Sequence, residues 1–453
     1  MMSPPAKKRS VLLVNPWIHD FSAYDFWMKP LGLLYLGSIL RSRGYEVSLL
    51  DCLNFTFLPE KFGAALKPPK RREFGRGHYY KEKIPKPDSL REIPRQYRRY
   101  GIPPESLRGL ISTITRPDLI LMTSSMTYWY PGLIETIRFL RQNIPEVPIL
   151  LGGTYATLCF DHAQKHSGAD RVLPGPWDKE KMQILSQYLG NPVLQGDADF
   201  ASWPYPAFDL YPMMEYVCLL TRCGCPFSCT YCATSILTKG FESRPISEVV
   251  QEITHWRDQF GVGDFAFYDD ALLINPSFHI LPFLHEVIRR SMRCNFHTPN
   301  ALHVKMIDEE VANLLFRGGF KTIRLGLETS NEGVQVETGG KVDNQDFRRA
   351  VRNLKKAGYS GEEIGVYLMV GLPGQRVEEV EESIAFVRET GAKPFLVEYS
   401  PIPGTPLFKK AKKMSPFDLE NEPLFHNNSI LPCQWEGFTG EDFRRLKERV
   451  RNY

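Results

Sequence analysis

Apolar runs of strand length alternate with longer stretches of helical spacing along most of the chain. Residues 11–15 form the first run, and its nearly continuous apolar character is typical of a strand buried on both faces of a parallel sheet. Residues 30–43 place leucines at helical spacing and end at Gly44, and residues 46–51 form the next apolar run. Strand, helix and strand in this order predict the beginning of a doubly wound α/β sheet.

The alternation continues as far as residue 190. It predicts helices over residues 105–115, 132–142 and 162–166, and strands over residues 119–122, 147–151 and 171–173. We therefore expect one Rossmann-like domain of about five strands over residues 8–190, with its ligand at the carboxyl ends of the strands. Three segments fall at those ends: Asn15-Pro16-Trp17, Ser124-Ser125-Met126 and Gly152-Gly153.

A second alternation begins at residue 215, after a proline-rich stretch, residues 191–214, that we expect to be a linker. It predicts strands over residues 215–220, 264–268, 294–298, 322–327, 363–370 and 395–399. The helices between them are expected over residues 248–260 (with Ser247 as N-cap), 278–290, 308–317, 344–356 and 377–389. Six such β/α units over residues 215–408 predict a partial barrel, with its chemistry at the carboxyl ends of the strands. Residues 409–453 end in a charged helical pattern and are expected to cover the open side.

Composition narrows the class of protein without identifying it. Of the 453 residues, 43% are hydrophobic and 24% are charged, and the longest apolar runs are too short to span a membrane. The N-terminus runs into the first strand without the apolar core of a signal peptide. Nine cysteines, an odd number with three of them clustered, favour metal ligation in a reducing compartment, so we expect a cytoplasmic protein.

Residues 67–100 differ in composition from the rest of the first domain. They hold twelve lysines and arginines against four acidic residues, with four interleaved tyrosines, and their prolines and glycines predict an irregular insertion. Such a segment can track a nucleic-acid backbone, so RNA is one candidate partner. We favour a lid over the ligand crevice, because the net charge of the whole chain is only +4.

A cluster of cysteines lies directly after the first predicted strand of the second domain. Cys225, Cys229 and Cys232 stand in a C-x3-C-x2-C arrangement, which can supply three corners of a 4Fe-4S cluster and leave one iron open. Cys218 and Cys223 precede them and permit a zinc site as the alternative. The single residue between Cys223 and Cys225 does not match the usual zinc spacing, which favours the cluster.

This segment resembles the signature of the radical S-adenosylmethionine (SAM) superfamily. The resemblance implies that the three cysteines hold the cluster and that SAM chelates the fourth iron. It extends to the strand ends, where FYDDALLIN, GLET and GVYLMVGLPG resemble SAM-holding segments. It thereby implies a SAM site that contains Tyr231, Asp269 (in preference to Asp270), Glu328, Val370 and Gly371. The Asp269-Asp270 pair could instead cap the next helix.

The first domain carries a second resemblance, to the cobalamin-binding domains that precede some radical SAM domains. Ser124-Ser125-Met126 matches the family's serine motif imperfectly, and Gly152-Gly153 matches its glycine pair. The resemblance implies a cobalamin site that includes Trp17, Ser124, Ser125, Gly152 and Gly153. The D-x-H-x-x-G motif, whose histidine ligates cobalt, is absent. His19 is the nearest substitute, but a lone histidine in a loop is more often a hydrogen-bonding residue, so we expect cobalt without a protein histidine.

Together the resemblances imply a radical SAM enzyme whose cofactors are a 4Fe-4S cluster, SAM and cobalamin. It would draw an electron from a donor such as flavodoxin or ferredoxin, form a 5′-deoxyadenosyl radical and methylate an unactivated carbon of a small-molecule or peptide substrate. Radical rearrangement, cyclisation or C–C bond formation without methyl transfer remains the alternative, as does an RNA-binding modification factor. We also expect Trp17, Ser125, Tyr128 and Trp129 to face Tyr231, Asp269 and Glu328 across one shared cavity. The sequence holds no motif that identifies the substrate.

Overall fold

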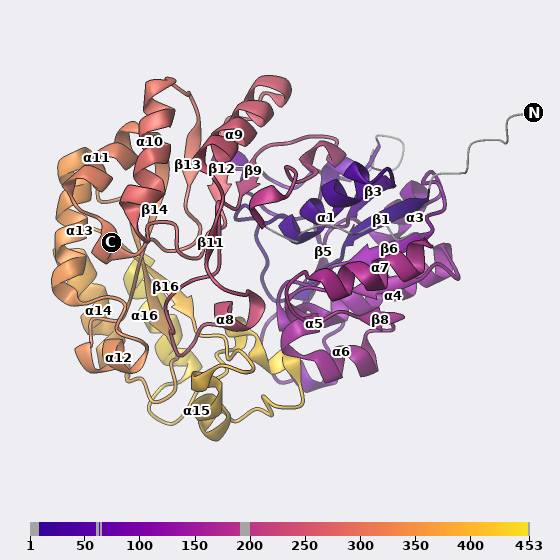
Figure 1. Cartoon of the computed structure of the whole chain (residues 1–453). Coiled ribbons are helices and arrows are strands. Elements are labelled where there is room, and N and C mark those ends of the chain that lie inside the picture. The colour runs from indigo at the N-terminus through magenta and orange to yellow at the C-terminus, as the bar shows by residue number, and fades with distance from the viewer. Residues whose placement is uncertain (1–8, 60–62, 64–65, 191–199, 452–453) are drawn as a thin grey trace, which may run out of the picture. The chain divides into compact units, whose positions relative to one another are not determined.

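The computed structural model describes residues 9–59, 63, 66–190 and 200–451 (Figure 1). The chain divides into two compact units, residues 1–214 and residues 215–453. Each unit has its own parallel sheet, and the predicted α/β fold is confirmed.

The first unit is built on a five-stranded parallel sheet with the strand order β3-β1-β6-β7-β8. Its strands are β1 (Ser10–Asn15), β3 (Glu46–Asp51), β6 (Leu119–Met122), β7 (Ile149–Leu151) and β8 (Arg171–Val172). Its helices are α1 (Leu31–Ser42), α3 (Pro104–Ile111), α4 (Tyr130–Asn143), α5 (Thr154–Leu158), α6 (Phe160–His166) and α7 (Lys179–Leu189). The chain leaves β1 towards one edge and later returns to its other side with β6. The carboxyl ends of β1 and β6 are therefore the switch point at which such sheets bind ligands.

Alternation along the strands divides the side chains between the two faces of this sheet. Leu12 and Ile120 join a buried cluster with residues of α3 and α4, whereas Leu121 and Leu150 face a cavity that α1 and α7 also line. Helix α1 packs closely on β1, because a Cβ at Gly37 would come within 2.8 Å of the Leu13 side chain. The two faces thus differ, since one is filled with side chains and the other contains a cavity.

The basic insertion is more regular than its composition predicted. Strand β2 (Ile18–Asp20), which follows β1, pairs antiparallel with β5 (Arg98–Tyr100), and β5 pairs antiparallel with β4 (Lys81–Lys83). Short 3-10 turns, η2 (Glu73–Gly75) and η3 (Asp88–Leu90), occupy part of the remainder. Tyr79, Tyr97 and Tyr100 are buried, so these tyrosines build a small core and are not available to stack on bases.

Part of the expected linker also belongs to the first unit. Residues 191–199 lie outside the described residues, but residues 200–214 pack against the sheet and α1. The Ala207 amide donates to the Leu34 carbonyl at 3.0 Å, and the Tyr211 hydroxyl donates to Asp51 Oδ2 at 2.7 Å. Phe208 is fully buried. The prolines of this segment suggested a linker, but its aromatic residues bury too much apolar surface to leave it free.

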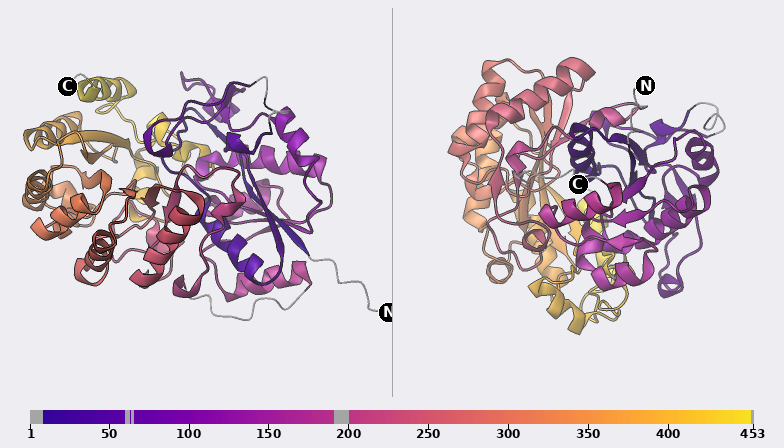
Figure 2. Two further views of the ribbon diagram at one scale, coloured as in Figure 1. Left: turned by 90° about the horizontal axis from the view of Figure 1, so that it is seen from above. Right: turned by 45° about the vertical axis from the view of Figure 1, so that its right-hand side comes forward.

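The second unit is a six-stranded parallel sheet with the order β16-β15-β14-β13-β12-β9. Its strands are β9 (Val217–Leu219), β12 (Asp264–Phe267), β13 (Asn295–His297), β14 (Phe320–Glu328), β15 (Ile364–Val370) and β16 (Lys393–Glu398). The main connecting helices are α9 (Ile246–Phe260), α10 (Ile280–Arg289), α11 (Glu309–Arg317), α13 (Asn344–Ala357) and α14 (Val377–Glu389), which lie along one face of the sheet (Figure 2). The strands run in chain order from edge to edge, as the predicted partial barrel requires.

The start of helix α9 differs from the expectation, and the C-terminal segment packs against the edge of the sheet. Helix α9 begins two residues earlier than predicted, with Pro245 as N-cap, so Ser247 lies inside the first turn. Helix α16 (Gly440–Arg451) pairs its Lys447 with Glu398 of the edge strand β16, with 2.5 Å between Nζ and Oε1. Cys433 is fully buried in an apolar cluster with Tyr399 and Leu407, which accounts for this isolated cysteine as a packing residue.

The described part of the chain contains no helix that is both long enough and apolar enough to cross a membrane. All nine cysteines lie within it, and none of them forms a disulfide.

Candidate functional site

The three clustered cysteines lie in a loop that leaves the carboxyl end of β9. This loop is fixed by its backbone, because the Thr230 amide donates to the Thr338 carbonyl at 3.2 Å and the Thr230 carbonyl accepts from the Leu407 amide at 2.9 Å. A short antiparallel pair, β10 (Arg222–Cys223) and β11 (Glu242–Ser243), closes its base. The loop therefore presents its thiols from a supported backbone, as a preorganised ligand set requires.

The thiols of Cys225, Cys229 and Cys232 are half-buried and close enough to interact electrostatically. Burial raises the pKa of Cys225 and of Cys229, and the charge of the Cys232 thiolate raises both further. Within the described residues, no three ligands converge as a single metal ion would need. A 4Fe-4S cluster binds each thiolate to a different iron, so its ligands stand further apart, and this half-buried set of three fits it.

Lys341, which no sequence motif indicated, lies beside the cysteines. Lys341 Nζ is 2.7 Å from Glu328 Oε1, and the Tyr231 hydroxyl donates to the same oxygen at 3.2 Å. The charges of Glu328 and Cys229 raise the pKa of Lys341 although burial lowers it. Glu328 and Tyr231 were predicted from the strand-end motifs, and the structure brings them together around this lysine.

The backbone here is shaped to hold the Glu328 carboxylate in place. Glu328 ends β14 with φ of 66°, in the left-handed region that a non-glycine residue rarely adopts, and the register with β15 shifts at the same point. A Cβ at Gly326 would lie 3.1 Å from Glu328 Oε1 and 3.5 Å from Lys341 Nζ. The glycine therefore leaves the space that the ion pair occupies.

A half-buried histidine, His303, adjoins this ion pair. The His303 ring stacks on Phe227 of the cysteine loop, with 4.7 Å between ring centroids. Burial, together with the Lys341 charge, lowers the pKa of His303 to about 4, so its imidazole is neutral at pH 7. Its Nδ1 is buried and finds no hydrogen-bond partner among the described residues. Neither Lys341 nor His303 lies in a motif, so only a three-dimensional arrangement could reveal them.

Asp269 does not join the group around Glu328. It is 3% exposed, and its carboxylate accepts hydrogen bonds from the Thr221 hydroxyl at 2.5 Å and the Thr221 amide at 3.2 Å. Thr221 Oγ1 in turn lies 2.7 Å from His279 Nε2. Asp270 is exposed, and its charge acts on Cys223 and Cys225. Of the two neighbouring carboxylates, Asp270 is therefore the one available to a ligand, contrary to the weak preference drawn from the motif.

The end of β15 contributes backbone more than side chains. Val370 is fully buried, and Gly371 has φ of 82° and donates its amide to Gln375 Oε1 at 2.9 Å. Tyr231 packs against the apolar cluster that contains Leu372, so the strand end and the cysteine loop are neighbours. Val370 and Gly371 can therefore offer a ligand main-chain contacts but no polar side chain.

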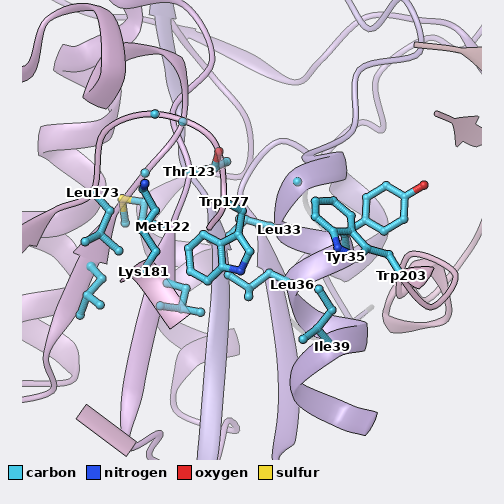
Figure 3. A pocket seen from close by; sticks show the side chains of 16 residues that line it. Leu33, Tyr35, Leu36, Ile39, Met122, Thr123, Leu173, Trp177, Lys181 and Trp203 are labelled. Carbon is cyan, nitrogen blue, oxygen red and sulfur yellow. The ribbon is translucent and has the colours of Figure 1, made fainter. Parts of the chain in front are cut away.

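The first unit has a separate candidate site, a cavity of about 230 Å³ on the face of its sheet that α1 and α7 share (Figure 3). Its walls come from α1, β6, β7 and the start of α7, and they are mostly apolar. Tyr35, Trp177 and Trp203 supply aromatic rings, and Figure 3 shows the Trp177 ring in the middle of the lining residues. Such a cavity suits a planar heteroaromatic group.

The two glycines after β7 have different roles at this cavity. Both line it, but a Cβ at Gly152 would meet only the Leu173 carbonyl oxygen, at 3.8 Å. Gly153 has φ of 93°, and a Cβ there would lie 2.3 Å from the Ser124 carbonyl oxygen. Gly153 is therefore required by the backbone itself, and Gly152 alone leaves open space towards the cavity.

The remaining residues of the expected cobalamin site do not line the cavity. The Ser124 hydroxyl donates to the Gly152 carbonyl at 2.8 Å and so joins β6 to β7, while its neighbour Thr123 lines the cavity instead. Ser125 is half-buried and is not part of the lining. Trp17 is 1% exposed and donates its indole N–H to the Ile102 carbonyl at 2.7 Å, within the core on the opposite face. A side chain so enclosed cannot contact a ligand.

His19 lies against the Glu135 carboxylate. Its Nε2 lies 2.5 Å from Glu135 Oε2, and Arg99 binds the other carboxylate oxygen at 2.6 Å. Burial acts to raise the pKa of Glu135, but the hydrogen bonds and charges of His19 and Arg99 outweigh it and lower that pKa. The histidine that stood nearest to a cobalt ligand is thus engaged with this carboxylate.

Residues 220–387 match the sequence model of the radical SAM superfamily. The matched range begins at the end of β9 and includes the three cysteines, Glu328 and Lys341. Since that superfamily is defined by its use of SAM and a 4Fe-4S cluster, the match assigns these two cofactors to the second unit.

Two curated relatives are methyltransferases by name. The chain is 24% identical over 365 residues to the uncharacterized methyltransferase PH0819 of Pyrococcus horikoshii, covering 72% of this chain and 73% of that protein. It is 22% identical over 505 aligned positions to cytidylyl-2-hydroxyethylphosphonate methyltransferase of Streptomyces wedmorensis, covering 95% and 87% of the two proteins.

Among solved structures, the chain resembles the radical SAM methyltransferase TsrM from Kitasatospora setae, determined with cobalamin and a 4Fe-4S cluster bound. The TM-score is 0.63 at 16% sequence identity, over 91% of this chain and 76% of TsrM. At this identity the likeness is one of fold.

Proposed function

Because residues 220–387 form a domain of the radical SAM superfamily, we propose that this enzyme also binds cobalamin and uses it to methylate an unactivated carbon. The observation that carries the proposal is the aromatic cavity of the first unit, which opens beside the strand end of Gly152 and Gly153. A radical SAM domain alone has no need of a second ligand-binding fold. A cavity suited to a planar base, on a sheet of this topology, fits the nucleotide tail of cobalamin.

The relatives support the same reading. TsrM combines cobalamin with a 4Fe-4S cluster, and two sequence relatives carry the name methyltransferase. Their substrates include tryptophan for TsrM and a cytidylylated phosphonate for the Streptomyces enzyme, which differ too much to identify a substrate for this chain.

In the second unit, Cys225, Cys229 and Cys232 would hold the cluster. Lys341 fixes the Glu328 carboxylate by a charge-assisted hydrogen bond, so the carboxylate is oriented before SAM arrives. The neutral His303 offers a buried nitrogen beside them, and the apolar end of β15 excludes water from that side. These groups can bind and orient the polar parts of SAM.

When bound, the cofactors supply the difficult chemistry, namely one-electron cleavage of SAM and transfer of a methyl group through cobalt. The chain's own contribution is positioning. Radical SAM chemistry requires an external electron, and we propose a small acidic redox protein such as flavodoxin or ferredoxin as its donor. Cobalt would carry no protein histidine, because His19 is bound to Glu135 and the D-x-H-x-x-G motif is absent.

The proposal is tested on protein purified and reconstituted without oxygen. We expect visible spectra with both iron–sulfur and corrinoid absorption. With dithionite and SAM we expect 5′-deoxyadenosine, and with cobalamin added we also expect S-adenosylhomocysteine. Protein that binds the cluster but gives no corrinoid absorption after incubation with cobalamin would contradict the cobalamin proposal.

The same assay separates methyl transfer from its alternative. Rearrangement, cyclisation or C–C bond formation would give 5′-deoxyadenosine without S-adenosylhomocysteine. SAM deuterated in its methyl group provides the second readout, because only methyl transfer carries the deuterium into a product.

A further inference from the structure

Lys181 is the only charged residue among the described residues that line the cavity of the first unit. It is 8% exposed, and it lies in the first turn of α7. A Cβ at Gly175 would be 4.0 Å from its Nζ, so the ammonium group lies next to the loop before α7. Figure 3 shows the side chain rising along the cavity wall beside Leu173.

One carboxylate holds this lysine in place. Asp178 is the N-cap of α7, and its Oδ1 accepts from the Lys181 amide at 3.1 Å while its Oδ2 lies 3.1 Å from Lys181 Nζ. An ammonium group has three N–H donors, and Asp178 takes up one of them. The Asp178 carboxylate also serves the helix end, so it cannot turn further towards the lysine.

Positive and negative groups meet at this point, since Lys181 and the start of α7 stand beside the carboxylates of Asp178 and Glu180. The start of α7 contributes the positive end of a helix dipole, and the helix has eleven residues. An enclosed ammonium group in an otherwise apolar wall gains stability from each further hydrogen bond to a negative group. The cavity thus combines aromatic walls for a planar base with one cationic contact, which is the chemistry of a nucleotide.

We propose that Lys181 binds the phosphodiester of the nucleotide tail of the corrinoid, and so makes the first unit select corrinoids that retain their nucleotide. The inference rests on the proposed cobalamin site and concerns which part of the ligand is recognised. Cobinamide, the corrinoid that lacks the phosphoribosyl base, would lose both the aromatic contacts and this ionic contact.

The test compares hydroxocobalamin with diaquocobinamide, each titrated into the full-length protein and followed by its visible absorption. We expect the parent to bind cobalamin more tightly. Lys181→Met, which keeps the length and apolar volume, should lower cobalamin affinity about tenfold, the usual size for one lost charged hydrogen bond. Its cobinamide affinity should not change, and Lys181→Arg should retain the preference.

Lys179→Met is the matched control, because Lys179 is exposed on the same helix turn and does not line the cavity. Unchanged cobinamide binding by Lys181→Met also reports that the variant is folded. Equal weakening of both corrinoids, or no change in either, would overturn the role of Lys181 and leave the cobalamin site standing. A parent protein that binds neither corrinoid would overturn the proposed function, and this inference with it.

Discussion

The two candidate sites of this molecule are built on opposite principles. In the second unit, the cysteine loop, Glu328 and Lys341 form a rim at the carboxyl end of the sheet. Charged side chains of this rim are already paired, the Glu328 backbone is in an unfavourable conformation, and the cysteines stand on a supported loop. The cavity of the first unit is apolar, aromatic and nearly free of charge. The first arrangement orients a reacting ligand, whereas the second retains a large ligand by shape. Substitutions at the rim should therefore affect turnover, and substitutions in the cavity should affect occupancy.

The largest effect should come from the cysteines of the rim. Replacement of Cys225, Cys229 and Cys232 by alanine should abolish both the iron–sulfur absorption and reductive cleavage of SAM, because it removes all three proposed ligands of the cluster. Cys223→Ala is the control: that thiol is half-buried next to the loop, and the variant should keep its cluster. A normal cluster in the triple variant would show that the ligands lie elsewhere.

Lys341→Met tests whether the paired charges of the rim orient SAM. The variant should keep its cluster but cleave SAM about 10- to 100-fold more slowly, because Glu328 loses its charged hydrogen bond. Lys410→Met removes an exposed ion pair with Glu337 and should leave the rate unchanged. Parent-like cleavage by Lys341→Met would mean that the ion pair has only a structural role.

A larger residue at Gly152 tests the cavity by its volume. Gly152→Val should weaken cobalamin binding at least about tenfold while the melting temperature stays close to that of the parent, because its side chain would enter open space. Gly153→Ala should instead destabilise the fold by about 1–3 kcal/mol, since its Cβ would collide with the Ser124 backbone. Full cobalamin affinity in Gly152→Val would place the tail outside this cavity.

The smallest expected effect is on the pH dependence of stability. It concerns the buried hydrogen-bond network of Asp269, Thr221 and His279, which does not include Glu328 or Lys341. Burial raises the pKa of Asp269 to about 6, although Thr221 hydrogen bonds lower it, so acidification from pH 7 to 5 protonates the folded protein and stabilises it. Burial and the Arg222 charge lower the pKa of His279 to about 3, so over the same range its unfolded form takes up the proton and stability is lost.

These two contributions oppose each other, so this pair of groups should change the stability of the parent little between pH 6 and 5. Asp269→Asn removes the opposing carboxyl contribution and leaves that of His279, so the variant should lose about 1 kcal/mol more stability than the parent over that unit. Urea unfolding at the two pH values measures the difference. An identical pH dependence in parent and variant would exclude this titration of Asp269.

The sequence predicted most strands and helices because their hydrophobic periods are unambiguous. It also placed the cysteine loop, Glu328 and Tyr231 in one region, and they lie together in the structure because motifs at strand ends meet in any parallel sheet. It failed for Asp269 because adjacent strand-end residues point to opposite sides, and the motif does not say which side faces the ligand. Trp17 failed for a related reason, because a large aromatic residue after a strand can close the core as readily as line a site.

Other parts of the molecule left no local signal. The role proposed for Lys341 depends on its pairing with Glu328, 13 residues away, and that of Lys181 on its pairing with Asp178, 3 residues away. Both roles also depend on burial, which a sequence does not display. The insertion was expected to be irregular, yet β2, β4 and β5 pair over long sequence separations that composition cannot reveal.

The positive φ of Glu328 has a consequence for anyone who selects this protein for heat resistance. A non-glycine residue in that region costs roughly 1 kcal/mol that glycine would recover. Glycine would also remove the carboxylate that Lys341 and Tyr231 hold, and loss of one partner of a buried ion pair costs about 3–5 kcal/mol. A screen by melting temperature alone would therefore retain Glu328, because its pairing with Lys341 outweighs the strain of its backbone.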